Sequence, residues 1–116
     1  IGSQGSLVAD TSVDVAFERR RAPLEATEAS RALARTAQSI YEEIGRSLVV
    51  DDSGTGGGTD AAFAAASRKP VVVESLGLIG FGFHASGEEY VELDPIRARL
   101  YLLTRLIMET SRSAQR

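Results

Sequence analysis

Two unbroken apolar triplets, residues 48–50 and 71–73, most constrain the fold of this 116-residue chain. A strand with one solvent-facing side alternates apolar and polar residues, whereas a strand covered on both faces, as in parallel sheets, is apolar throughout. A glycine-rich stretch follows each triplet, and helical patterns flank them. The order predicts an α/β fold with mostly parallel pairing. The chain supplies few strands to flank residues 71–73, so the pattern fits part of a larger sheet.

Apolar spacing and end signals predict three helices. The first follows Thr27, whose side chain can cap it, and stops at Gly45. Its apolar stripe repeats at intervals of four, three and four residues: Leu33, Ala37, Ile40 and Ile44. The second is the alanine-rich stretch 61–66. The third begins at Asp94-Pro95, a cap followed by proline at the first helical position. Its predicted buried stripe is Ile96, Leu100, Leu103 and Ile107.

Two further strands are expected from alternating residues. Residues 13–17 alternate apolar and polar, which predicts a strand with one buried face, and residues 90–93 suggest a shorter one. Residues 1–12 show little periodicity and form a predicted loose lead-in. Residues 76–83 form a predicted apolar, glycine-punctuated loop that ends at His84.

Composition excludes several classes of function. The formal net charge of −3 gives no reason to expect nucleic acid or an anionic membrane as partner. No apolar run approaches the roughly 20 residues that span a bilayer, so no membrane span is expected. The chain contains no cysteine, which excludes disulfides and thiolate metal sites and leaves the compartment open.

The loop of residues 54–60 is the strongest local chemical signal, because it combines four glycines with two threonines and an aspartate before a helix. Glycines allow close backbone approach to a ligand, and a helix start favours a carboxylate, phosphate or oxyanion. The Gly-Lys-Ser/Thr ending of a nucleotide P-loop is absent. Anion binding and a plain strand-to-helix turn are equally compatible with this pattern.

Two single residues are candidates for site chemistry. His84 is the only histidine, and it follows a glycine loop after a predicted buried strand, where α/β sheets place their sites. Catalytic zinc needs three or four protein ligands, so one histidine is not enough. The spacing of the nearby carboxylates makes no metal set, and a solvated role is their default: Asp51, Asp52, Glu74, Glu88 and Glu89. Arg21 could grip a carboxylate, although spacing alone favours a solvated arginine.

Several spaced strings together resemble the C-terminal end of bacterial glutamate carboxypeptidases. The strings are GGGTDAAFAA at 56–65, ESLGL at 74–78, GFGFH at 80–84 and EYV at 89–91. The wider family includes acetylornithine deacetylase and succinyl-diaminopimelate desuccinylase, and its members are zinc hydrolases. The resemblance is dense from about residue 56 to 108, weaker but collinear over 13–45, and does not cover residues 1–12. RRAPLE at 20–25 is similar to the family's arginine-proline segment.

The resemblance implies a domain division and a set of site residues. Residues 13–21 would be the last strand of a lid domain, and residues 24–112 the C-terminal part of a catalytic α/β sandwich. His84 matches the family's last metal ligand in a site of two zinc ions. The matching substrate-carboxylate contacts are Arg21, Gly57, Gly58 and Thr59. Ala22 stands where the family has proline, which leaves Arg20 as an alternative to Arg21.

The function implied by this resemblance is a zinc metallocarboxypeptidase that releases C-terminal glutamate. The substrate would be a small peptide or N-acyl amino acid with a free carboxylate. The catalytic base and the other metal ligands would come from a missing N-terminal part of the protein, so this chain alone is predicted to be inactive. A homodimer through the lid domain and a periplasmic or secreted location are implied, with the cytoplasm left open. Alternatives are a deacetylase or desuccinylase, or a non-catalytic α/β anion-binding or assembly module.

Overall fold

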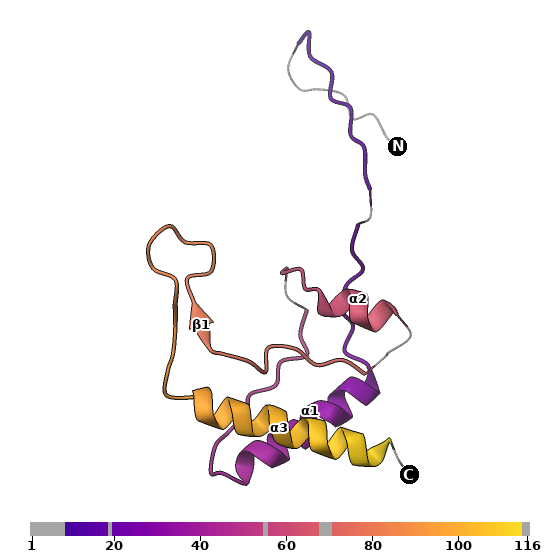
Figure 1. The fold of residues 1–116 in the computed structure, drawn as a ribbon. Coiled ribbons are helices and arrows are strands. Elements are labelled where there is room, and N and C mark those ends of the chain that lie inside the picture. The colour runs from indigo at the N-terminus through magenta and orange to yellow at the C-terminus, as the bar shows by residue number, and fades with distance from the viewer. Residues whose placement is uncertain (1–8, 19, 55, 68–70, 115–116) are drawn as a thin grey trace.

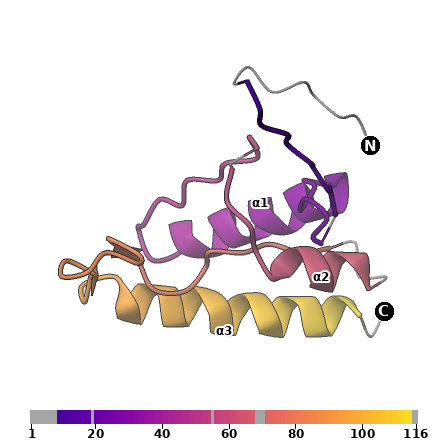
Figure 2. The ribbon, with the colours of Figure 1, turned by 90° about the horizontal axis from the view of Figure 1, so that it is seen from above.

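The computed structural model describes residues 9–18, 20–54, 56–67 and 71–114. Within these residues the elements are α1 (Glu28–Glu42), α2 (Ala61–Ala66), β1 (Gly80–Phe81), β2 (Tyr90–Val91) and α3 (Ile96–Ser113). The two long helices lie side by side and run in opposite directions (Figures 1 and 2). The short helix α2 and the β1–β2 hairpin lie at separate places beside this pair (Figure 1).

The ends of α1 follow the signals in the sequence. The Thr27 hydroxyl oxygen accepts a hydrogen bond from the Ser30 amide at 3.1 Å, which satisfies one of the free donors at the helix start. Gly45 has a φ of +69°, a left-handed conformation that suits glycine. Its amide donates to the Glu42 carbonyl at 2.9 Å. The predicted cap and stop of this helix are therefore confirmed.

The core is the seam between α1 and α3. It is built from seven buried residues: Ala37, Ile40, Tyr41, Leu48, Ala98, Leu102 and Leu106. Val73 and Leu76 pack against this cluster from the segment that follows α2. The Val72 amide donates to the Ser30 hydroxyl at 3.1 Å, which ties the same segment to the start of α1. Residues 71–76 are thus held on the helix pair and lead from there to the hairpin.

The face of α3 that is buried differs from the predicted one. Leu100 and Ile107, which were expected in the core, are 63% and 66% exposed, and Ile96 and Leu103 are only half-buried. The buried residues of α3 lie on the other side of the helix: Ala98, Leu102 and Leu106. The prediction failed because α3 is apolar on two faces, and spacing does not tell which face α1 covers.

The predicted strands are only partly found. Residues 48–50 and 71–73, and the described part of 13–21, adopt no regular structure, so no parallel sheet forms among the described residues. A strand needs a paired neighbour to complete its hydrogen bonds, and among the described residues the only paired strands are β1 and β2. The strand expected within 90–93 is present as β2. It pairs antiparallel with β1, which falls inside the stretch predicted as loop, with Gly80 opposite Val91 and Phe81 opposite Tyr90.

The shape of the chain is open. Its radius of gyration is 20.1 Å, whereas a compact domain of this length has a value of about 13 Å. Residues leading into α1 extend away from the helices (Figure 1), and Phe17 is 86% exposed there. A large apolar surface therefore remains without a cover from the described residues.

In the part of the chain that the structure describes, no helix combines the length and apolar character needed to cross a membrane.

We predict that Leu102→Ala destabilises the 116-residue chain strongly. The Leu102 side chain is fully buried in the α1–α3 seam, and such truncations cost about 2–5 kcal/mol. Leu100→Ala is the matched control, because it is the same change on the same helix at an exposed position. Urea unfolding followed by circular dichroism measures both. Equal losses for the two variants would contradict the assignment of the buried face.

We also predict that protonation of the Glu43 carboxylate in acid makes the chain less stable. The Tyr101 hydroxyl donates to the Glu43 carboxylate at 2.7 Å and Arg105 pairs with it at 2.9 Å. These hydrogen bonds lower the pKa of Glu43. Because the folded-state pKa is the lower one, the stabilisation is complete above the ordinary glutamate pKa of about 4.3 and is lost as pH falls through the folded value.

Melting temperatures measured between pH 3 and 7 would show this loss. The Glu43→Gln variant should melt at a lower temperature at neutral pH and approach the parent chain in acid. Glu42→Gln is the control, since the described residues form no ion pair with that neighbouring glutamate. If the pH profile of Glu43→Gln ran parallel to that of the parent, the link between α1 and α3 would be refuted.

Candidate functional site

All four residues that the family resemblance matches to substrate-carboxylate contacts line one cavity. Arg21, Gly57, Gly58 and Thr59 border a space of about 520 Å³ between α1, α2 and the segments 48–54 and 72–76. Arg21 stands 36 positions before Gly57 in the sequence, so the fold brings the arginine and the glycine loop together. His84 is not among the residues that line this cavity.

The Arg21 side chain lies against the start of α2. One Nη nitrogen is 3.3 Å from an Asp60 carboxylate oxygen, and the guanidinium carbon is 5.2 Å from the centre of the Phe63 ring. A Cβ atom added to Gly58 would lie 2.7 Å from the other Nη nitrogen, so the guanidinium packs directly on the glycine loop. Arg20, the alternative, pairs instead with Glu18 on an exposed segment. The structure therefore favours Arg21 as the arginine of this cavity.

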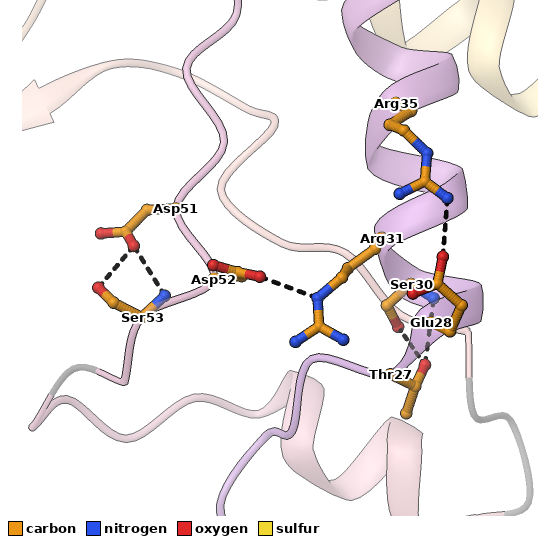
Figure 3. A network of polar contacts seen from close by, with 8 residues as sticks. All are labelled: Thr27, Glu28, Ser30, Arg31, Arg35, Asp51, Asp52 and Ser53. Carbon is orange, nitrogen blue, oxygen red and sulfur yellow. Dashed lines mark hydrogen bonds and ion pairs between the residues drawn. The ribbon is translucent and has the colours of Figure 1, made fainter.

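Side chains on both sides fix the glycine loop. The Thr59 hydroxyl oxygen accepts a hydrogen bond from the Ala61 amide at 3.1 Å, as expected for a residue at a helix start, and the hydroxyl donates to the Glu74 carboxylate. Before the loop, Arg31 of α1 pairs with Asp52 at 2.8 Å (Figure 3). The stretch from Asp52 to Thr59 is thus attached to α1 at one end and to the 71–76 segment at the other. Thr55 lies outside the described residues.

A second set of hydrogen bonds forms a local turn at Asp51, just before the glycine loop. The Asp51 carboxylate accepts hydrogen bonds from the Ser53 hydroxyl at 2.6 Å and the Ser53 amide at 2.8 Å (Figure 3). These bonds lower the pKa of Asp51, because they stabilise its charged form. Asp51 therefore serves the local turn, in agreement with the solvated role expected from the sequence.

His84 lies on the loop between β1 and β2, where its side chain is exposed. Its φ of +66° is uncommon for a residue with a Cβ atom. The loop is closed by a hydrogen bond from the Ala85 amide to the Gly82 carbonyl at 2.9 Å. Gly82 is also left-handed, at φ +69°, and an added Cβ would be 2.3 Å from the Glu88 carbonyl oxygen. The hairpin backbone thus defines where the imidazole stands.

The residues present can supply part of a zinc site. In the described ranges, no group of three or more histidine, cysteine, aspartate or glutamate side chains could hold a metal ion. Catalytic zinc takes three protein ligands and keeps one position open. An exposed imidazole on a loop of defined shape fits a role as one ligand of a site whose other ligands come from outside the described residues.

Two contacts of Arg21 were not predicted from the sequence. Asp60 was placed only in the glycine loop before a helix, yet its carboxylate pairs with Arg21, and no hydrogen bond caps the helix through its side chain. Phe63 was read as part of an alanine-rich helix, and it lies against the same guanidinium. No spacing rule links positions 21, 60 and 63, so only the three-dimensional arrangement reveals them.

Comparison with known proteins places the chain in a family. Residues 1–109 match the model of peptidase family M20/M25/M40. The chain belongs to this family. The match begins at residue 1, so it includes residues 1–12, which the resemblance seen in the sequence left out. Of those residues, the structure describes only 9–12.

A curated relative of this M20/M25/M40 chain is Carboxypeptidase G2 of Pseudomonas sp. (strain RS-16). The two are 45% identical over 107 residues, which cover 92% of this chain and 25% of the relative. The chain therefore spans about a quarter of the length of that protein. The resemblance to carboxypeptidases, first drawn from short strings of residues, is confirmed by both comparisons.

We predict that Gly82→Ala disrupts the hairpin that bears His84. Alanine at a left-handed position costs roughly 1–2 kcal/mol, and here its Cβ would also collide with the Glu88 backbone. Gly87→Ala is the control in the same loop, because nothing lies within 4 Å of its added Cβ. Nuclear Overhauser contacts between Phe81 and Tyr90 report on the hairpin. Their survival in Gly82→Ala would contradict the described loop geometry.

Proposed function

We propose that this chain is the C-terminal portion of a zinc-dependent hydrolase that releases glutamate from the C-terminus of a peptide or N-acyl amino acid. Family membership supports a peptidase, and the name of the curated relative supports a carboxypeptidase. The observation that carries the proposal is the position of the Arg21 guanidinium against Gly58, beside Thr59 and within one cavity.

Arg21 would bind the free carboxylate of the substrate. A guanidinium offers paired N–H donors that match the two oxygens of a carboxylate. Its present partner, Asp60, has a side chain that is 92% exposed, and such exposed ion pairs contribute at most about 1 kcal/mol. A substrate carboxylate that also reaches the loop amides of Gly57 and Gly58 would displace Asp60 readily. Thr59 would add a hydroxyl donor, which now binds Glu74.

His84 would contribute one ligand to a site of two zinc ions, with the other ligands and the catalytic base on a preceding part of the protein. When bound, the metal ions would polarise the scissile carbonyl and activate water. Within this chain, the hairpin would orient the imidazole and the cavity would fix the far end of the substrate. As part of the same proposal, the complete protein would form a homodimer through its lid domain.

The experiment is kinetic analysis of the full-length protein with an N-acyl-glutamate substrate, together with zinc determination by mass spectrometry. Arg21→Ala should raise KM about 10- to 100-fold, which corresponds to the loss of hydrogen bonds to a charged group. Arg20→Ala is the matched control, since Arg20 pairs with Glu18 away from the cavity. His84→Ala should lower the zinc content and abolish activity.

Three outcomes would overturn the proposal. A fully active, zinc-free protein would exclude the metal role of His84. A KM that is unchanged in Arg21→Ala would exclude the carboxylate grip. Hydrolysis of N-acetyl or N-succinyl amino acids, with no release of C-terminal glutamate, would identify the deacetylase or desuccinylase alternative.

A further inference from the structure

The Arg21 guanidinium needs support from the protein if it is to meet a substrate in one place. Arg21 is an exposed residue in a stretch with no regular structure, so its side chain is not positioned by a helix or strand of its own. Three contacts of the guanidinium come from the start of α2 and the loop before it: Gly58, Asp60 and Phe63. On the proposed function a substrate carboxylate displaces Asp60, which leaves the glycine and the aromatic ring as lasting supports.

Phe63 has no other evident task in the described structure. Its side chain is 52% exposed, whereas the buried residue of α2 is Ala62. The other five residues of this helix are alanines, so Phe63 is the one α2 side chain long enough to reach a distant cation. The Arg21 guanidinium carbon, 5.2 Å from the centre of the ring, lies within the range of a cation–π attraction.

We propose that Phe63 is a positioning residue for Arg21, and that Gly58 leaves the space in which the guanidinium lies. This inference rests on the proposed function and deepens it, because it assigns a second residue to the selection of substrates with a free carboxylate. The aromatic face attracts the charge, while the N–H edge of the guanidinium stays available for a carboxylate. The two interactions are therefore compatible in the bound state.

The test uses the full-length enzyme and two substrates, an N-acyl-glutamate and its analogue in which the α-carboxylate is a carboxamide. Phe63→Ala should raise KM for the carboxylate substrate about two- to fivefold, the range expected for an exposed cation–π contact, with kcat unchanged. KM for the carboxamide should not move. Phe63→Leu should behave like alanine because it lacks a π face, and Phe63→Tyr should restore the parent KM.

Gly58 supplies a second arm that does not depend on the aromatic ring. Gly58→Ala would push against the Arg21 Nη nitrogen, and this flexible group can give way without unfolding the chain. It should therefore raise KM for the carboxylate substrate alone. Gly56→Ala is the matched control, since nothing lies within 4 Å of its added Cβ.

The outcomes separate this inference from the proposed function. If Arg21→Ala raises KM and every Phe63 variant keeps the parent KM, Phe63 has no positioning role and the inference fails alone. If Phe63→Ala changed KM equally for both substrates, the role of Phe63 would be merely structural and the inference would fail. A simultaneous fall in kcat and in zinc content would lead to the same conclusion. If Arg21→Ala itself leaves KM unchanged, the carboxylate grip of the proposed function fails.

Discussion

The packing of α3 on α1 is the interaction on which the rest of the structure depends. Leu102 and Ala37 are completely buried in this seam, and Val73 and Leu76 pack against the same cluster from a neighbouring segment. The remaining elements are too small to fold by themselves. A six-residue helix lies below the length at which helices are stable in water, and a two-stranded hairpin is marginal without support. Both therefore owe their placement to segments attached to the helix pair.

The same seam explains why the fold is open. It covers one face of α3 and leaves Leu100 and Ile107 in solvent, although α3 is apolar on that side as well. Residues 48–50 and 71–73 show the same mismatch, since they have the composition of strands covered on both faces but lack neighbours. These features agree with the family comparison, in which the chain corresponds to a quarter of a longer protein. On the proposed function, a larger sheet and its helices would bury these exposed surfaces in the complete protein.

Local signals could be interpreted from the sequence, and non-local pairing could not. The cap at Thr27 and the left-handed Gly45 each depend on a few adjacent residues, and both predictions were confirmed. Helix α3 begins close to the predicted start, but Pro95 is its N-cap and no side chain caps it, so the predicted cap at Asp94 was wrong. The buried face of α3 and the predicted parallel strands depend on which segments meet, which spacing does not encode. The site divides in the same way. Only the family resemblance assigned Arg21 and Gly58 to the same site. The contact of Phe63 with Arg21 could not be predicted, because the two residues are 42 positions apart.

The two chemical parts of the candidate site are built on different physical principles. Arg21 is placed by side-chain contacts with α2, which are individually weak and can exchange with a substrate carboxylate. The backbone at His84 is shaped by two left-handed residues, His84 itself and Gly82, and a Cβ atom at Gly82 would collide with the Glu88 carbonyl oxygen. A metal ligand must hold its geometry through every turnover, whereas a substrate grip must bind and release. A sterically constrained loop for the imidazole and an adaptable support for the guanidinium therefore suit the separate tasks that we propose for them.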